Sequence, residues 1–123
     1  HDADDLAATH ATWGAPIAGD YRRVTLAEHA PNGQGAAAIL ILNILSHFDL
    51  ASLDPFGPAR LHLEAEAARL AHDARDRLIG DPARTMRLDH MLSPATAERL
   101  AALIDPRRAM PPGPPPTHAI HRD

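Results

Sequence analysis

Histidine–carboxylate pairs are the residues of this chain whose types and spacing suit metal binding. Among nine histidines, His62 precedes Glu66 by four residues, and His72 precedes Asp76 by the same interval. Residues four apart share a helix face, and imidazole and carboxylate groups are common ligands of Zn²⁺. At about 100° per residue, however, the two pairs point about 80° apart and do not converge on one ion. They favour a solvated face with local ion pairs, and we predict no metal and no cofactor.

Nucleophilic side chains do not combine into a complete active site. The chain has no cysteine and no Gly-x-Ser-x-Gly elbow. Ser46, Ser52 and Ser93 lie in helix-end or capping contexts, where serine is common for structural reasons. His47 follows Ser46 but faces another way on a helix. We therefore assign no catalytic or substrate-binding residue within the chain.

A glycine-rich turn, Pro31-Asn32-Gly33-Gln34-Gly35, runs into an apolar stretch. Two glycines before a helix suit an anion-binding nest of backbone N–H groups. The lysine and Ser/Thr of a P-loop do not follow, and the third spaced glycine of a dinucleotide site is missing. The favoured interpretation is a tight strand-to-helix turn that brings two backbone segments close together.

Three helices follow from the apolar spacing. Residues 36–45 have almost no polar face, so this helix must be surrounded by other protein, and at about ten residues it is shorter than the roughly 20 that span a bilayer. A second helix should begin at Pro58 and end near Ile79, before Gly80-Asp81-Pro82. A third should open at the Ser93-Pro94 cap and stop before Asp105-Pro106. The predicted inward residues are Leu63, Ala67, Leu70, Ala74 and Leu78 of the second helix and Ala97, Leu100, Ala101 and Ile104 of the third, and the predicted exposed pairs are Glu66/Arg69 and Asp73/Arg77.

The two ends of the chain have weaker patterns. Asp4 or Asp5 should cap a short helical turn at residues 6–8, and alternation within residues 21–28 predicts one or two strands. Residues 111–116 are rich in proline and predict an extended connector. Residues 117–123, with His118 and His121, have no pattern and are expected to form a tail. The predicted fold class is mostly α, with one or two short strands.

Composition limits the classes of function. The chain has 123 residues, 45% of them apolar but only 3% aromatic, and a formal net charge of -4. All its basic residues are arginines spread among aspartates, so a nucleic-acid surface is not indicated. The first residue, His1, is neither an initiator Met nor part of a signal-like segment, which leads us to expect a processed chain or a piece of a longer one.

Short motifs in a characteristic order cover nearly the whole chain. They are Asp5-Leu6-Ala7, Trp13 with Pro16-Ile17, Asp20-Tyr21-Arg22, Pro31-Asn32-Gly33-Gln34-Gly35, Leu42-Asn43-Ile44-Leu45, Phe48-Asp49-Leu50, Leu61-His62-Leu63, Glu64-Ala65, Arg69-Leu70-Ala71, Asp76-Arg77, Gly80-Asp81-Pro82 and Leu92-Ser93-Pro94. In this order and spacing they resemble the gamma-glutamyltranspeptidase family, and specifically the C-terminal part of its large subunit. Ala30 and the stretch Ala71-His72 depart from the family pattern, which suggests a divergent or acylase-like branch.

The resemblance implies an N-terminal-nucleophile hydrolase with an αββα fold, made as a precursor that cleaves itself. Cleavage frees a threonine at the start of a small subunit, and its hydroxyl attacks gamma-glutamyl amides such as glutathione. Residues 1–110 would be the helical C-terminal portion of the large subunit, and residues 111–123 the connector leading to the autoprocessing site. The nucleophile is expected just after Asp123. The expected partners are the small subunit and the remainder of the large subunit.

Three hypotheses for function remain open at this point. The first is a structural scaffold in a gamma-glutamyl transferase or hydrolase, inactive alone. The second is the same machinery acting on a cephalosporin-type or glutaryl amide. The third is a non-enzymatic helical interaction module. An isolated scaffold piece is expected to expose its apolar helix, residues 36–45, and to associate, whereas a module should be a stable folded monomer.

Overall fold

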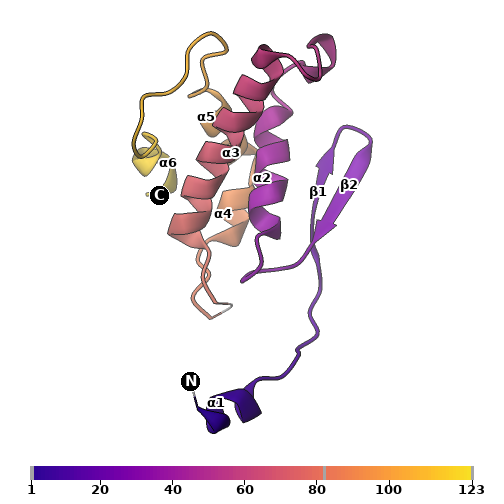
Figure 1. Cartoon of the computed structure of the whole chain (residues 1–123), viewed down its shortest axis with the longest axis vertical. Helices are drawn as coiled ribbons and strands as arrows, with labels where there is room; N and C mark the ends of the chain where they lie inside the picture. The colour runs from indigo at the N-terminus through magenta and orange to yellow at the C-terminus, as the bar shows by residue number, and fades with distance from the viewer. Residues whose placement is uncertain (1, 82, 123) are drawn as a thin grey trace.

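The computed structural model describes residues 2–81 and 83–122 and shows a helical core with a β-hairpin on one side (Figure 1). His1, Pro82 and Asp123, which the sequence predictions named, lie outside the described residues. The mostly α class with short strands is confirmed. The elements in chain order are α1 (Ala3–Ala8), β1 (Ile17–Tyr21), β2 (Val24–Glu28), α2 (Gly35–Leu45), the 3₁₀ turn η1 (Leu50–Ser52), α3 (Pro58–Leu78), α4 (Leu88–Leu92), α5 (Pro94–Ala101) and α6 (His118–His121).

Helix α2 is the centre of the molecule, as its lack of a polar face predicts. It lies between α3 and the hairpin and also contacts α4 and α5 (Figure 1). Ala36, Leu40 and Ile44 have an exposed fraction of 0%. The expectation that the isolated chain would expose this helix is wrong, because the chain's own elements cover it.

Helix α3 follows its predicted bounds and buries its predicted stripe. Pro58 occupies the first turn, and Ile79 is the C-cap. All five residues predicted to face inward are buried, so the spacing of three and four residues correctly identified the packed face. Of the two ion pairs predicted on the outer face, Asp73/Arg77 is present and Glu66/Arg69 is not.

The hairpin β1–β2 packs against α2 through one face. Its strands are antiparallel, with Tyr21 opposite Val24, so Arg22 and Arg23 form a two-residue turn. Arg22 has a φ of 58°, and its guanidinium lies over the Tyr21 ring, 5.3 Å from the ring centroid. Gly19 faces Ile39 of α2 so closely that a Cβ on Gly19 would lie 2.4 Å from the Ile39 Cγ2 atom. The hairpin therefore sits directly on the central helix.

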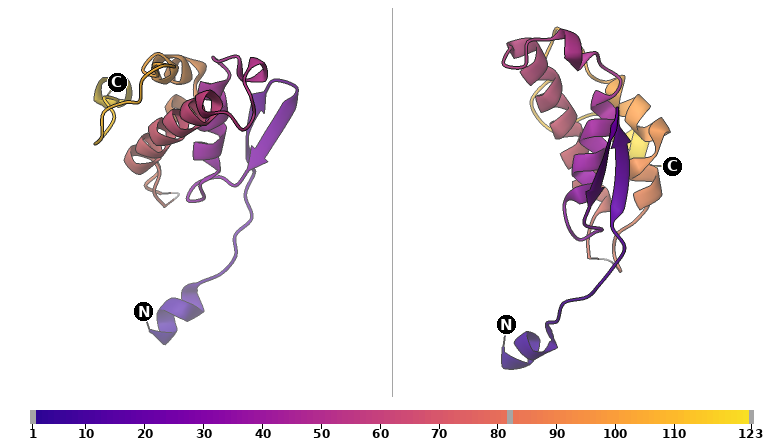
Figure 2. Two further views of the ribbon diagram at one scale, coloured as in Figure 1. Left: turned by 45° about the horizontal axis from the view of Figure 1, so that its top comes forward. Right: turned by 90° about the vertical axis from the view of Figure 1, so that its right-hand side faces the viewer.

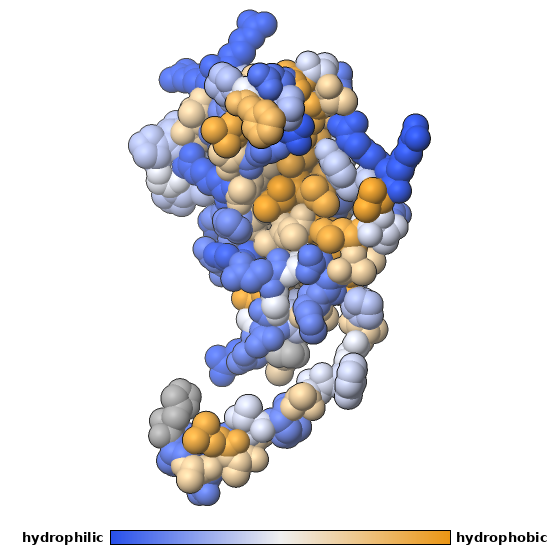
Figure 3. Space-filling view, turned by 45° about the vertical axis from the view of Figure 1, so that its right-hand side comes forward, coloured by the Kyte–Doolittle hydropathy of each residue, from blue (hydrophilic) through white to orange (hydrophobic). Residues whose placement is uncertain are grey.

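The N-terminal arm extends away from this core (Figures 1 and 2). Helix α1 is capped by Asp2, and the prediction that Asp4 or Asp5 would be the cap is wrong. The Asp2 carboxylate accepts from the N–H groups of Asp4 and Asp5 at 3.1 and 3.0 Å, and the Asp5 carboxylate accepts from the Asp2 N–H. This reciprocal arrangement is a capping box, which satisfies the first free donors of the helix. Apolar side chains lie on the surface of this arm (Figure 3), and Leu6 and Trp13 are exposed.

The C-terminal third folds back over α3. Ser93 caps α5 by accepting from the Thr96 N–H, as predicted, and the four predicted inward residues of this region are buried. Helix α5 ends at Ala101, earlier than the predicted stop before Asp105. Two short helices, α4 and α6, were not predicted. Met91 of α4 and Ile120 of α6 are buried in the common core, so residues 117–122 are not a tail.

No helix in the part of the chain that the structure describes combines the length and the apolar character needed to cross a membrane.

Candidate functional site

One polar row of α3 binds the polypeptide that follows α5, from Met110 to Thr117, which we call the connector in describing the structure. We call this row the connector cradle; it consists of Glu66, Arg69, Asp73 and Arg77. These residues are spaced three and four apart, so they share one helix face. Three of them bind residues more than forty positions further along the chain, and Arg77 supports Asp73. The cradle therefore fixes the path of the connector across the helical core.

The first half of the cradle grips the backbone at the start of the connector. Glu66 is buried, and its Oε1 atom accepts from the Met110 N–H at 2.9 Å. The Arg69 guanidinium donates to the carbonyl oxygens of Met110, Pro111 and Gly113. A proline-rich segment has few N–H groups of its own, so a planar donor such as guanidinium suits its unpaired carbonyls. This long-range contact explains why the predicted Glu66/Arg69 ion pair is not formed.

The second half of the cradle binds Thr117, which is fully buried. The Thr117 hydroxyl donates to the Asp73 carboxylate, and Arg77 donates to both oxygens of that carboxylate at 2.9 and 3.1 Å. Burial acts to raise the pKa of Asp73, but the hydrogen bonds from Arg77 and Thr117 and the charge of Arg77 outweigh it. The resulting pKa is lower than the usual value. Asp73 therefore stays ionised and is a weak base toward the threonine hydroxyl.

Two arginines complete the docking of α6. Arg87, which precedes α4 at a φ of 55°, donates from Nη1 to the His121 carbonyl at 2.9 Å. Arg99 of α5 donates from Nη2 to the Ala119 carbonyl at 3.0 Å. Cations bonded to the last carbonyls of a helix also interact favourably with its dipole. The segment is thus held from three helices.

The glycine-rich turn forms a cleft between α2 and α3. Asn32, Gly33 and Gln34 line one side, and Arg75 and Asp76 the other. The Arg75 guanidinium donates to the Gln34 side chain at 2.6 Å and to the Asp76 carboxylate at 2.7 and 2.9 Å, so its charge is already paired. The paired charge of Arg75 favours the interpretation of a tight structural turn and argues against an anion-binding nest.

The other residues weighed from the sequence are not brought together. The hydroxyls of Ser46, Ser52 and Ser93 donate to nearby backbone carbonyls. His62 contacts the Asp105 carbonyl through Nε2 at 2.8 Å, while Glu66 serves the connector. Over residues 2–81 and 83–122, no group of three or more His, Asp or Glu side chains is arranged to hold a metal ion.

We expect Arg69→Met to loosen the start of the connector. The substitution keeps the apolar stem of the side chain but removes its bonds to three carbonyls. A hydrogen bond to a charged group contributes about 1.5–3 kcal/mol when shielded from water, and less when partly exposed. Hydrogen exchange at the Met110 amide should therefore accelerate about tenfold. Arg60→Met is the matched control, since Arg60 pairs only within α3, with Glu64. Equal exchange in both variants would contradict a clamping role for Arg69.

The residues of the cradle were partly visible in the sequence, but their function was not. Glu66/Arg69 and Asp73/Arg77 were predicted as two local ion pairs on the exposed side of one helix, and not as a binding site. Thr117 was missed, because a single threonine after prolines carries no periodic signal.

The fold and this site define a class: a helical scaffold unit that carries a β-hairpin on one side and positions a connector on the other. The helices of this unit bind residues 110–117 and fix the path of their backbone.

Comparison with known proteins gives the family. The gamma-glutamyltranspeptidase family model matches residues 2–122, and the chain belongs to this family. It is 32% identical over 82% of its length to the glutathione hydrolase-like YwrD proenzyme of Bacillus subtilis, and 40% identical over 64% of its length to the glutathione hydrolase proenzyme of Escherichia coli. The matched regions are 19% and 14% of those proteins, so the chain spans less than a fifth of their length.

A solved structure agrees with the sequence relationship. The fold superposes on the gamma-glutamyltranspeptidase of Helicobacter pylori with a TM-score of 0.79 and 29% identity, covering 88% of this chain and 32% of that one. The recognition made from ordered motifs is therefore confirmed.

Proposed function

We propose that this chain is the C-terminal part of the large subunit of an enzyme that transfers or hydrolyses gamma-glutamyl amides such as glutathione. The observation that carries the proposal is the family match over residues 2–122. The relatives are named as a glutathione hydrolase proenzyme and a glutathione hydrolase-like proenzyme, which favours gamma-glutamyl substrates over the cephalosporin-type or glutaryl alternative. The whole enzyme would have an αββα fold, of which this chain supplies outer helices and one hairpin.

In this proposal the chain acts as a scaffold and residues 111–123 lead to the autoprocessing site. Residues 1–110 form the helical portion, and the connector cradle fixes the path of the connector before the cleavage point. The nucleophilic threonine follows Asp123, its α-amino group serves as base, and backbone N–H groups stabilise the oxyanion. The small subunit and the remainder of the large subunit complete the enzyme. The path of residues 110–117 along α3 supports this role, because a cleavage site needs a defined backbone geometry.

The test is self-processing and activity of the full-length precursor. We expect it to split into two subunits and to hydrolyse a gamma-glutamyl anilide, with a glutaryl amide assayed beside it and turned over more slowly. The isolated 123-residue chain should be inactive. A full-length protein that stays intact and inactive would refute the proposal, and faster turnover of the glutaryl amide would move it to the acylase class.

The position of cleavage is tested by N-terminal sequencing of the small subunit. We expect its first residue to be a threonine beyond Asp123. A subunit that begins at Thr117 would keep the enzyme class but place the nucleophile on the connector cradle. That outcome would give the Thr117–Asp73 hydrogen bond a role before cleavage.

The interaction-module hypothesis now needs this same assay. Since α2 is covered by the chain's own elements, a folded monomer no longer distinguishes a module from a scaffold. Self-processing of the precursor does.

A further inference from the structure

Helix α6 and the threonine before it are docked by contacts that do not depend on any partner. The Thr117 hydroxyl binds Asp73 of α3, and Ile120 enters the core with an exposed fraction of 6%. The Ile120 and His121 amides donate to the Thr117 carbonyl at 2.8 and 3.2 Å, so these two amides report whether the segment is folded. The docked segment, residues 117–121, is too short to be a stable helix when detached.

Two histidine rings meet where α6 packs on α4. The ring centroids of His90 and His121 are 5.7 Å apart, and the rings are edge-to-face with an interplanar angle of 84°. Both ring nitrogens of His121 are buried, and neither has a hydrogen-bond partner among the residues that the structure describes. A neutral imidazole tolerates such a site far better than an imidazolium ion, which would be desolvated there.

The charges around His121 come from each helix packed against it. Helix α3 contributes Asp73 and Arg77, which are paired with each other, and the α4 region contributes Arg87 and His90. Asp73, the carboxylate that acts on a protonated His121 within the part of the chain that the structure describes, is already bound by the Arg77 guanidinium.

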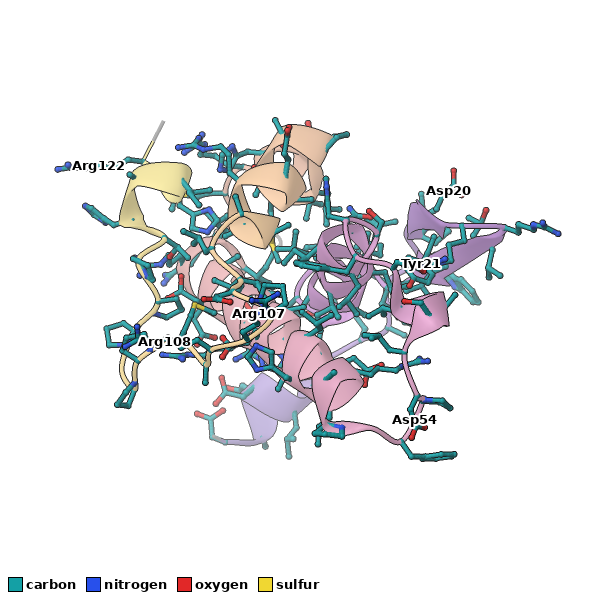
Figure 4. The ribbon with its side chains drawn as sticks, turned by 90° about the horizontal axis from the view of Figure 1, so that it is seen from above. Asp20, Tyr21, Asp54, Arg107, Arg108 and Arg122 are labelled. Carbon is teal, nitrogen blue, oxygen red and sulfur yellow. The ribbon has the colours of Figure 1, made fainter. Side chains whose placement is uncertain are left out.

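Further arginines lie near α6. Arg99 of α5 binds the Ala119 carbonyl and adds positive charge. On the segment itself, His118 is exposed, and Arg122 lies beyond α6 and points outward (Figure 4).

The pKa of His121 agrees with this geometry. Burial lowers the pKa below its ordinary value, and repulsion by His90 is the next cause. Asp73 acts in the opposite direction, whereas Arg77 and Arg87 add to the lowering. The detached His121 takes up a proton near its ordinary pKa of about 6.5, and the docked one only at lower pH. Proton uptake thus favours the detached state, so docking is strongest above about pH 6.5 and weakens as the pH falls below it.

We propose that residues 117–121 form an acid-released latch, in which the packing of the neutral His121 ring against the His90 ring keeps α6 on the helical core and protonation of His121 detaches it. When the latch opens, Ile120 leaves the core and Thr117 leaves Asp73. The connector is then held by Glu66 and Arg69 alone. The latch follows from contacts within the described chain, so it stands whether or not the proposed enzymatic function does.

The test is hydrogen exchange in the full-length protein at about pH 7.5 and about pH 5.5, on either side of the ordinary histidine pKa. After correction for the chemical exchange rate, protection of the Ile120 and His121 amides should fall about tenfold at the lower pH. Amides in the middle of α3, for example at Leu70, should keep their protection and serve as the internal reference. Equal protection of α6 at both values would overturn the proposal.

Three variants assign the effect to the histidine pair. His121→Phe keeps an aromatic ring that cannot be protonated, so protection of the Ile120 amide should no longer depend on pH. His118→Phe is the matched control on the same helix, and its pH dependence should equal that of the unmodified protein. His90→Phe removes the repulsion that His90 exerts on a protonated His121 and should reduce the dependence, which keeps the test decisive if His121→Phe fails to dock. A pH dependence that persists in a docked His121→Phe, that is unchanged in His90→Phe or that is lost in His118→Phe would overturn the assignment.

Discussion

We expect Leu40→Ala to lower the free energy of unfolding by about 2–5 kcal/mol. Leu40 lies midway along α2, has an exposed fraction of 0% and belongs to the core cluster shared with α3, α4 and α5. Its truncation removes buried methyl groups and leaves a cavity that the surrounding elements cannot fully close. The measurement is urea denaturation of the chain, monitored by far-UV circular dichroism.

Leu61→Ala is the control for that experiment. Leu61 lies on α3 and has an exposed fraction of 67%, so the same chemical change should alter the free energy of unfolding by no more than about 0.5 kcal/mol. If the two variants were equally stable, α2 would not be the centre of the folded core.

The two long helices could be predicted because each has a clear pattern of apolar residues. Residues 36–45 are apolar on almost every side, so this helix is stable in water only when other elements surround it. Helix α3 instead repeats a packed residue every three or four positions on one face. The short helices α4 and α6 had no such signal. Each is too short to be stable by itself, so its formation depends on burying Met91 or Ile120 against elements distant in the sequence.

The cradle shows the limit of reasoning from local spacing. Glu66 and Arg69 are close enough on the helix to pair, and so are Asp73 and Arg77. Only the second pair forms, because the connector offers Glu66 an N–H donor and Arg69 three carbonyl acceptors. A local ion pair at a surface contributes at most about 1 kcal/mol, so long-range backbone partners readily displace it. The predicted solvated pair Glu66/Arg69 does not form, because residues 110–113 bind both of its side chains.

We expect Gly35→Ala to destabilise the chain by about 1–3 kcal/mol, although alanine is the better helix former. Gly35 is the first residue of α2, and an added Cβ would lie 2.4 Å from the Glu28 Cβ atom and 2.7 Å from the His29 carbonyl oxygen. Helix propensity alone would favour alanine by about 1 kcal/mol. The overlap with β2 and the turn after it opposes that gain, and a backbone carbonyl cannot rotate away as a side chain can.

Gly14→Ala separates crowding from the loss of glycine itself. No atom lies within 4 Å of a Cβ added to Gly14, so this variant should leave the urea midpoint unchanged or raise it slightly. If Gly35→Ala were as stable as Gly14→Ala, the turn would tolerate a side chain and the close approach would be unimportant. If it is destabilised, the requirement for glycine at this turn is explained by lack of space. The end of β2 and the His29 carbonyl lie so near the start of α2 that the hairpin packs on the central helix only where a side chain is missing.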